Sequence, residues 1–509
     1  MRRGATTSSS AGTETTIDTA PRIEGDPAPE TEDEPILRTR GDPAPATGGE
    51  SGPETGGEPA PPALPPPVTA LLGELWAAGC AAYVVGGSLR DALLGRPAHD
   101  WDLATDARPE RLLELHPEAM YENRFGTVVV RREGVAYEIT TFRSDHDYAD
   151  HRRPERVEFG RRIEDDLARR DFTVNAMAWG GAPAATPIPT SPAFVDPFGG
   201  RTDAYAGILR AVGEPRARFE EDALRMVRAV RLAATLGFTV EPATLAAIAA
   251  NAELARHLSG ERIAAELEKL LAAPRPSVGF RLMADTGLLD VVFPEISAQR
   301  GIVQGKIPGD DLLDHTLRSV DAAPRDRPVV RLAALVHDVG KPVTLADGHF
   351  RGHEIVGATI AGDLLRRLRM PRATIDRVTL LVRQHMFSYQ PEWSDGAVRR
   401  FINRIGRHAL EELFELREAD NVGSGFFGPS PDIVELRGRV AEQLEAKVAL
   451  DLRDLAVNGD DLIAELGLTP GRTVGALLDD LLEQVIADPE SNDRPTLLLL
   501  AQAMLEPDR

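Results

Sequence analysis

The sequence predicts an α+β protein, in which a head with a mixed, largely antiparallel sheet is followed by a helical remainder. Two patterns support this fold class. Short apolar runs and turns dominate up to about residue 200, and apolar residues spaced three to four apart dominate afterwards. The expected head elements are a helix over 69–78 and strands over 82–85, 127–130 and 136–141. The expected later helices include 222–236, 260–271, 312–322 and 329–336.

The length of 509 residues favours several domains, because single cores stop growing well before that size. Residues 1–67 hold 13 of the 39 prolines among many Gly, Ser and Thr residues, which predicts a disordered tail. The predicted domains after this tail are the head at 68–203, a helical neck at 204–272, a connector at 273–308, a third domain at 309–425 and a helical C-terminal tail at 426–509.

The net charge of −22 argues against a general coating protein for nucleic acids, because such proteins neutralise phosphates with Lys and Arg. The tail at 1–67 has 12 acidic and 5 basic residues, a net charge of −7, so the remainder repels RNA less than the total suggests. A secretory signal and a membrane-length apolar run are both missing, and Cys80 has no second cysteine to pair with. We therefore expect a cytoplasmic protein.

The most informative segment reads Tyr-Val-Val-Gly-Gly-Ser-Leu-Arg-Asp at 83–91 and His-Asp-Trp-Asp-Leu at 99–103. It predicts a strand, a glycine turn, a helix and a second strand. Since alternate residues of a strand share one face, Asp100 and Asp102 would present two carboxylates side by side. Such oxygen ligands suit Mg²⁺ and the transfer of a nucleotide by in-line displacement. An exposed structural Asp-x-Asp is the alternative if the pair is taken alone.

The residues between the strands are suited to contact a phosphate. Gly86 and Gly87 let backbone N–H groups approach closely, and Arg90 adds a charged fork. The whole string, Gly-Gly-x-x-Arg-Asp and then Asp-x-Asp nine residues after Asp91, resembles the signature of the class II tRNA nucleotidyltransferase and poly(A) polymerase family. The resemblance implies a polymerase-β-like nucleotidyltransferase head with Mg²⁺ bound by the two aspartates.

Two later motifs continue the resemblance. The family places a third carboxylate on a neighbouring strand, which implies Glu138 here, although a solvent-facing strand glutamate is the alternative. The segment 169–176 is similar to the family's ribose-reading motif and implies nucleotide-binding roles for Arg170, Asp171 and Asn175. A carboxylate such as Asp171 can accept a hydrogen bond from a 2′-OH, which distinguishes RNA precursors from DNA precursors.

Residues 221–231 match the family's template-like helix. We expect Asp222 and Arg225 on one helical face, where they could pair with the amino group and ring nitrogen that cytosine and adenine share. Uracil and guanine would leave buried polar groups unpaired. A solvated helix in which Asp222 pairs with its own Arg225 is the alternative. The resemblance implies that Arg228 and Arg231 also face the nucleotide or its phosphates.

Residues 145–154 are polar and lack apolar periodicity, which predicts a mobile loop. A loop at this place resembles the family element required for adding the final A.

The helical region contains a second set of metal-ligating residue types. The stretch Leu-Val-His-Asp-Val-Gly-Lys-Pro at 335–342 resembles the HD phosphohydrolase superfamily and implies an HD-like domain over 309–425. Nitrogen and oxygen ligands together suit a divalent transition metal. The candidate ligands are His315, His337, Asp338, His353, His385 and Asp420.

The favoured function is that of an enzyme that adds C, C and A to the tRNA 3′ end from CTP and ATP, without a nucleic-acid template. The first alternative is a poly(A) polymerase with the same head. The second alternative is a metal-dependent phosphohydrolase of the HD type, in which the head only binds RNA. The sequence makes no prediction about the oligomeric state.

Overall fold

The structure is a computed structural model that describes residues 62–98, 100–123, 126–146, 156–182, 192–446 and 448–505. The predicted tail over 1–67 lies outside these residues up to position 61, and its last two residues already belong to the first helix, which begins at Pro66. Most of the predicted loop over 145–154 also lies outside them. Its first two residues, Asp145 and His146, end a described strand instead.

The head elements follow the sequence prediction closely, with strands at 82–85, 127–132 and 135–141. They are α1 (Pro66–Ala77), β1 (Ala82–Val85), α2 (Gly86–Leu93), β2 (Asp102–Thr105), α3 (Pro109–Leu115), β3 (Met120–Asn123), β4 (Thr127–Arg132), β5 (Val135–Thr141), β6 (Arg143–His146), β7 (Arg156–Phe159), α4 (Ile163–Ala168), η1 (Thr173–Asn175), β8 (Ala178–Gly181) and β9 (Ala193–Val195).

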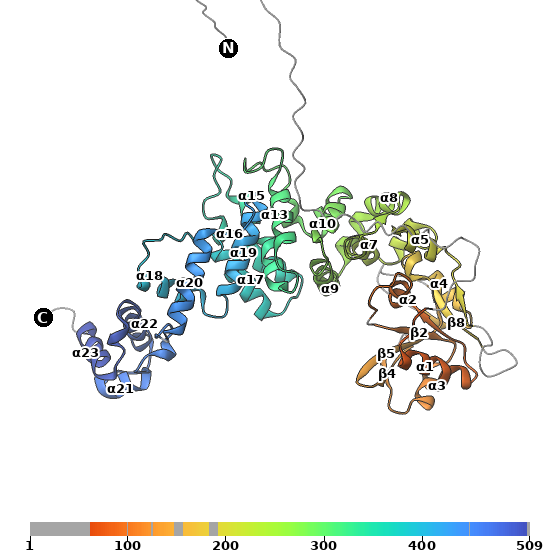
Figure 1. Cartoon of the computed structure of the whole chain (residues 1–509), viewed down its shortest axis with the longest axis horizontal. Helices are drawn as coiled ribbons and strands as arrows, with labels where there is room; N and C mark the ends of the chain where they lie inside the picture. Colours follow the sequence, from red (N-terminus) through yellow and green to blue (C-terminus); the bar gives the residue numbers. More distant parts are fainter. Residues whose placement is uncertain are drawn as a thin grey trace, which may run out of the picture. The chain divides into compact units, whose positions relative to one another are not determined.

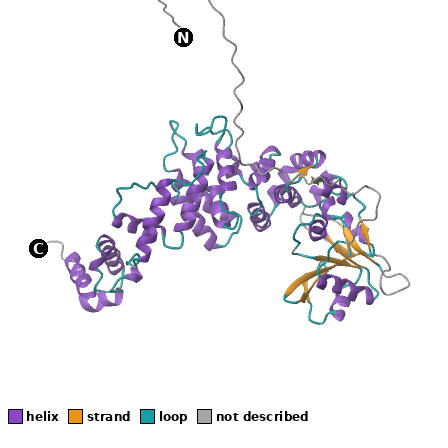
Figure 2. Ribbon diagram, in the orientation of Figure 1, coloured by secondary structure: helices purple, strands orange, loops and turns teal. Residues whose placement is uncertain are grey.

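The main sheet of the head has seven strands in the order β3-β4-β5-β2-β1-β8-β9. Figure 1 labels β2, β4, β5 and β8 of this sheet, and Figure 2 shows its strands in orange. Strands β2 and β5 pair in parallel, and the other neighbouring strands of this sheet pair antiparallel. A mixed sheet followed by helices confirms the predicted fold class.

Apolar side chains hold this sheet from both faces. On one face, residues such as Leu103 and Ile139 share a core with helices α1 and α3. On the other face, Val85 and Ala104 pack with Leu167 of α4. The second face is covered around β1 and β2, whereas Glu138 on β5 is exposed. Asp102 on β2 and Glu138 on β5 therefore lie at the boundary between the covered and the exposed part of this face.

The remainder is helical apart from two short strands. It comprises α5 (Gly200–Ala206), β10 (Ile208–Leu209), α6 (Pro215–Glu221), α7 (Leu224–Leu236), β11 (Thr239–Val240), α8 (Pro242–Asn251), η2 (Ala252–His257), α9 (Gly260–Leu271), α10 (Pro276–Asp285), α11 (Leu288–Val292), α12 (Pro294–Ser297), α13 (Leu312–Ala322), α14 (Pro328–Val336), α15 (Lys341–Thr344), α16 (His353–Arg367), α17 (Arg372–Gln384), α18 (Asp395–Ile405), α19 (Leu410–Gly423), α20 (Pro431–Glu445), η3 (Leu452–Asp454), α21 (Gly459–Leu466), α22 (Arg472–Ala487), η4 (Pro489–Ser491) and α23 (Arg494–Leu505).

Two hydrophobic cores organise these helices. One is continuous from Phe172 to Leu450, and a smaller one joins residues between Ala449 and Ala501. The large core spans the proposed neck, connector and third domain, so the bounds between these three remain proposals. In the part of the chain that the structure describes, no helix has the length and apolarity to cross a bilayer.

Candidate functional site

Strand register brings two of the predicted carboxylates together. Asp102 is the first residue of β2 and is aligned with Glu138 of the parallel strand β5. Asp100 precedes the strand and is exposed. The predicted strand, which included both aspartates, therefore starts two residues too early. The strand cannot extend back to Asp100 along β1, because the last β1 partner, Val85, is followed directly by helix α2. Burial raises the pKa of Asp102, the charge of Asp100 raises it further, and Arg170 opposes both.

Gly86 is required at the start of α2 for two reasons. Its φ of +80° lies in the left-handed region, which favours glycine. A Cβ atom at this position would also lie 3.1 Å from Arg170 Nη1 and 3.4 Å from Asp102 Oδ2. The absence of a side chain thus leaves the first N–H groups of α2 next to Asp102, where an anion can approach them.

A basic cavity of about 400 Å³ lies beside Asp102. Six arginines from the head, from α7 and from α9 give it a strong positive charge, which suits a nucleoside triphosphate. Its wall consists of Gly86, Gly87, Asp102, Arg143, Arg169, Arg170, Asp171, Asn175, Asp222, Leu224, Arg225, Arg228 and Arg262.

Buried carboxylates hold part of this arginine array. Asp166 of α4 lies 2.7 Å from Arg169 and 3.3 Å from Arg170. Asp171 accepts a hydrogen bond from Arg228 Nε at 2.8 Å and another from the Asn175 amide at 3.2 Å. Burial raises the pKa of Asp171, but the charge of Arg228, the hydrogen bond from Asn175 and the charge of Arg225 together outweigh it and lower the pKa to about 2.

Asp222 and Arg225 line the same cavity, but they do not share a helix as predicted. Helix α6 ends at Glu221 and α7 begins at Leu224, so Asp222 lies in an extended link between them. Its Oδ1 accepts the Leu224 N–H at 3.1 Å, because aspartate favours capping a helix start over a place inside the helix.

The two residues also have separate partners. Asp222 Oδ2 accepts a hydrogen bond from Arg262 at 2.7 Å, whereas Arg225 donates to Glu221 at 2.7 Å. The alternative in which Asp222 simply pairs with Arg225 is therefore wrong. Both side chains face the same cavity because the chain breaks between α6 and α7, not because they are three residues apart on one helix.

Four of the residues predicted for the nucleotidyltransferase site lie away from the basic cavity wall. Arg90 is buried and donates to Asn175 Oδ1 at 2.6 Å, so it supports the wall from behind. Arg231 pairs with Glu266 at 2.9 Å. Asp100 and Glu138 border a second cavity of about 480 Å³, which also includes Asp102.

The prediction missed Arg262, Leu224 and Arg143. It assigned no role to Arg169, although this residue begins the segment 169–176 that resembles the family's ribose-reading motif. Arg262 lies on the correctly predicted helix α9, but it reaches Asp222 across 40 residues of sequence. Only the packing of α9 against α7 brings the two together, so no local pattern could have indicated the contact.

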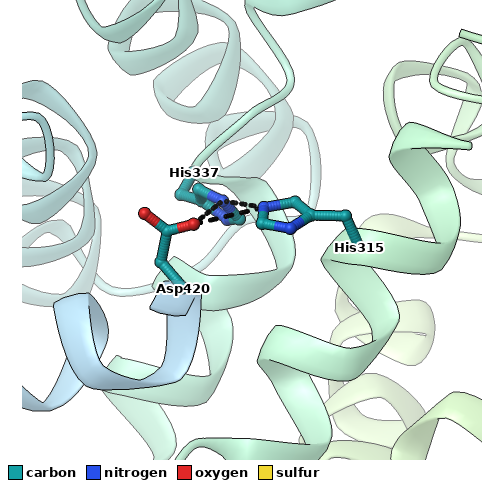
Figure 3. A group of neighbouring side chains, drawn as sticks. All are labelled: His315, His337 and Asp420. Atoms are coloured by element: carbon teal, nitrogen blue, oxygen red, sulfur yellow. Dashed lines mark hydrogen bonds and ion pairs between the residues drawn. The ribbon is translucent and has the colours of Figure 1, made fainter. Parts of the chain in front are cut away.

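The helical region brings the second predicted ligand set together in one buried centre. Its six residues come from the helices α13, α14, α16, α17 and α19 or from the residues directly after them. Two trios each offer atoms within 4.8 Å of one another: His315, His337 and Asp420, and Asp338, His353 and His385. Figure 3 shows the first trio, whose side chains point toward one another from three segments of the chain.

The histidines of this His/Asp centre are oriented by the backbone. The Nδ1–H groups of His337, His353 and His385 donate to the carbonyls of residues 334, 350 and 382 at 2.7–2.8 Å. Each Nε2 therefore keeps its lone pair directed into the centre, as a metal ligand requires.

Asp338 connects the two trios. Its Oδ2 lies 3.3 Å from His315 Nε2 and 3.2 Å from His337 Nε2, and its Oδ1 lies 3.3 Å from His353 Nε2. The carboxylate is 1% exposed, and its Oδ1 accepts no hydrogen bond. A buried acceptor without a donor is costly, so this geometry fits a cation between the trios.

Three family models match the chain in order. Residues 82–210 match the poly A polymerase head domain, residues 237–300 match the probable RNA and SrmB- binding site of polymerase A, and residues 356–501 match the putative domain 2 of tRNA nucleotidyltransferases. The fold and these matches place the protein in the class of nucleotidyltransferases with a poly(A) polymerase type of head.

The relatives narrow this class. The CCA-adding enzyme of Geobacillus stearothermophilus is 35% identical over 436 residues, which cover 84% of this chain and 95% of the relative. The CCA-adding enzyme of Lacticaseibacillus paracasei is 33% identical over 85% of this chain and 95% of its own length. That of Geobacillus thermodenitrificans is 48% identical over 227 residues, 44% of this chain and 54% of the relative. The chain therefore belongs to the family of CCA-adding enzymes.

Solved structures agree with this assignment. The Bacillus stearothermophilus CCA-adding enzyme, solved in complex with CTP, has a TM-score of 0.63 and 31% identity, covering 87% of this chain and 99% of that one. A Thermotoga maritima CCA-adding enzyme, solved with tRNA, shares the fold at 21% identity and a TM-score of 0.52.

Proposed function

We propose that this protein adds C, C and A to the 3′ end of tRNA, using CTP and ATP and releasing pyrophosphate. The observation that carries the proposal is the basic cavity, in which arginines for a triphosphate and a base-facing Asp222 and Arg225 surround Asp102. The reaction is attack of the RNA 3′-OH on the α-phosphate of the bound nucleotide.

Asp100, Asp102 and Glu138 are the proposed catalytic carboxylates. The first two fit Mg²⁺, because like charges and burial already disfavour ionised Asp102 and a divalent cation would relieve both. When bound, Mg²⁺ would lower the pKa of the attacking hydroxyl and stabilise the departing pyrophosphate. The N–H groups of Gly86 and Gly87 and the guanidinium of Arg170 would bind the triphosphate beside them. Arg90 would hold Asn175, and Asp171 would accept from the ribose 2′-OH.

The proposed base selection uses the donors and acceptors that remain available. The hydrogen bonds of Arg225 to Glu221 and to the carbonyls of Arg218 and Arg169 use three of its five N–H donors. The others can donate to the ring nitrogen or carbonyl of the base. Each oxygen of Asp222 has a second lone pair, which can accept from the amino group that cytosine and adenine share. Arg228 would neutralise Asp171 and the nearby phosphates, and Arg231 would hold α7 against α9 through Glu266.

The test is incubation of the purified protein with tRNA transcripts that end before CCA, after the first C, or after CC, each with a single nucleotide. We expect C to be added to the first two and A only to the third. Asp102→Asn should add nothing, and an exposed control, His408→Ala, should behave as wild type. Long A tracts on unrelated RNA would instead support the poly(A) polymerase alternative.

We further propose that the His/Asp centre binds a divalent transition metal, because imidazole nitrogens outnumber carboxylates there. A cavity of about 730 Å³ opens onto Asp338, His353, His385 and Asp420. Lys306, Lys341 and Arg417 also line it, so an anion can be bound next to the metal ligands. This favours a phosphohydrolase activity on a terminal or cyclic phosphate as a second candidate function.

Two measurements separate metal binding from hydrolysis. The nickel, cobalt and manganese content of His337→Ala should fall to background while that of His408→Ala does not, and unchanged content would exclude the ligand role. Release of phosphate, or opening of a 2′,3′-cyclic phosphate, on short RNA should then require the metal. If the metal-loaded protein catalyses neither reaction, the centre has a structural role.

A further inference from the structure

The mouth of the His/Asp centre has apolar side chains beside its charges. The cavity that opens onto Asp338 and His385 also has Phe350, Met386 and Phe426 in its wall. The Met386 side chain is 50% exposed and the Phe426 side chain is 69% exposed. A site for an inorganic anion needs cations but gains nothing from exposed rings. The mouth therefore indicates a ligand that has a flat apolar face as well as an anionic group.

The turn after α19 places Phe426 at this mouth. The Gly425 N–H donates to the Val422 carbonyl at 3.0 Å, and the Phe426 N–H donates to the Asn421 carbonyl at 2.9 Å. Gly425 has a φ of +87°, so this is the left-handed helix ending that favours glycine. An apolar residue at the place of Phe426 often packs back on the helix, but the residue it would meet here is the polar Asn421. The helix ending thus does not account for the exposed ring.

A neighbouring loop holds the same turn from the other side. Lys306 Nζ donates to Ser424 Oγ at 2.9 Å. A Cβ atom at Gly425 would lie 3.1 Å from Ile307 Cδ1, so the two loops are in close contact. A turn that is fixed by a helix end and by a second loop presents its side chains with little loss of entropy on binding.

Phe427 lies one residue further along and outside the cavity wall. Its side chain is 81% exposed, the highest value for a large apolar side chain in the part of the chain that the structure describes. Phe426 belongs to the wall, whereas Phe427 does not. Two adjacent rings, one at the mouth of a cavity and one beyond it, suit the stacking of two successive bases.

The charges around the cavity suit a nucleic-acid strand. Four cations line it: Lys306, Lys341, Arg351 and Arg417. Among its described wall residues, Glu354 is the one carboxylate that is not a candidate metal ligand. Cations along a groove together with exposed aromatic rings are the combination that binds single-stranded nucleic acid.

We propose that Phe426 and Phe427 form a stacking platform for the last two bases of a single-stranded RNA whose terminal phosphate lies in the His/Asp centre. The substrate class of this centre is then an RNA end of at least two nucleotides, and a mononucleotide is a poorer ligand. Stacking tolerates any base, so the sequence of the RNA end matters little. This inference rests on the proposed phosphohydrolase activity and names its substrate.

The test compares two ligands that cannot be hydrolysed, on the full-length protein loaded with nickel. One is cytidine with a 3′-methylenephosphonate, and the other is a tetraribonucleotide with the same terminal group. We expect Phe426→Ala to weaken the binding of both about tenfold, as for the loss of one stacked base. Phe427→Ala should weaken the tetranucleotide about tenfold and the mononucleotide less than twofold, because a single nucleotide reaches only the ring in the wall.

Three controls separate stacking from other contacts. Leu499→Ala removes an apolar side chain of α23 that is as exposed as Phe426 but lies outside the cavity wall, and it should keep both affinities. Phe427→Tyr keeps a ring and should bind the tetranucleotide as wild type does, whereas Phe427→Leu should bind it as weakly as Phe427→Ala. Because the head is also proposed to bind RNA, a tetranucleotide with 4-thiouridine at its last position locates the site. It should crosslink within residues 421–430.

Four outcomes would overturn the inference. They are unchanged tetranucleotide binding in both Phe→Ala variants, an equal loss for both ligands in Phe427→Ala, wild-type binding in Phe427→Leu, and crosslinks that map only to the head. The third outcome would indicate an apolar protein partner instead of RNA.

Failure of the proposed phosphohydrolase activity gives a different result. The nickel-loaded wild type would then bind the tetranucleotide through the platform but release no phosphate from an ordinary 3′-phosphate end. A wild type that releases phosphate, together with Phe→Ala variants of unchanged affinity, refutes the stacking platform alone.

Discussion

The two candidate metal sites of this protein are built in contrasting ways. In the head, strand register places Asp102 next to Glu138, and Asp100 beside them is exposed. In the His/Asp centre, six side chains meet where five helices end or pack, and none is more than 7% exposed. The first site is an open edge of a sheet, and the second is enclosed by side chains.

This contrast separates the two chemistries. An open pair of carboxylates leaves most positions of a bound Mg²⁺ for water and phosphates, so metal and substrate can exchange in every cycle. An enclosed centre rich in imidazole binds transition metals more strongly, and exchange is hindered by burial. We therefore expect EDTA to stop nucleotide addition at once and excess Mg²⁺ to restore it. Metal loss from the His/Asp centre should be slower.

The largest expected effect concerns the open site. Asp102→Asn removes one charge from the proposed Mg²⁺ ligands and should lower the rate of C addition by about a thousandfold or more. The transition-metal content of the same variant should stay at the wild-type level, because the His/Asp centre shares no residue with the head. Single-turnover addition with labelled CTP, together with metal analysis, measures both. Activity within about tenfold of wild type would contradict the assignment of Asp102.

The next effect concerns the enclosed centre. Asp338→Asn removes the carboxylate that faces both trios and the ion-pair partner of Lys341, which lies 2.6 Å away. We expect metal binding to be lost and the protein to be destabilised by about 3 kcal/mol, because Lys341 would remain buried without its counter-charge. Metal analysis and thermal unfolding test this, and C addition measured well below the unfolding temperature should persist. Retained metal would show that Asp338 does not bridge the trios.

The same contrast explains what the sequence could predict. Strands over 82–85 and 136–141 and helices such as α9 and α13 follow from local patterns, and the structure has them where expected. The His/Asp ligand types were also identified, because the Leu-Val-His-Asp string carries a resemblance. How Asp338 connects two trios could not be predicted, since it depends on how α13, α16, α17 and α19 pack.

The prediction for the proposed base-selecting pair, Asp222 and Arg225, was wrong about the helix that carries them. Periodicity predicted one helix over 222–236, but Asp222 interrupts it by capping α7. An aspartate next to a helical pattern fits both a helical position and a cap, and only the chain geometry decides between them. Arg262 was missed because its contact with Asp222 is tertiary.

A moderate effect is expected for base choice. Arg225→Ala removes donors that the ring nitrogen and carbonyl of cytosine would use, at a cost of about 1 to 3 kcal/mol. The ratio of kcat/KM for CTP over UTP should fall by roughly ten- to a hundredfold. Arg216→Gln is the control, because Arg216 is an exposed residue of the neighbouring helix α6 that pairs with Glu220. An unchanged ratio in Arg225→Ala would mean that base selection lies elsewhere.

The smallest effect concerns the stability of the head near the basic cavity. Arg228, together with Asn175 and Arg225, overcomes the effect of burial and lowers the pKa of Asp171 from its ordinary 3.8 to about 2, so the folded state favours the charged carboxylate. This stabilisation, about 2 kcal/mol, is fully present above pH 4 and is lost as the pH falls through 3.8 toward 2. Asp171→Asn should therefore unfold in less urea than wild type at pH 6, and the gap should narrow at pH 3. Asp165→Asn, which removes an exposed charge from α4, is the control and should show no such pH-dependent gap. An equal gap in both variants would mean that the net charge of the protein, and not the contact between Asp171 and Arg228, determines the pH dependence of stability.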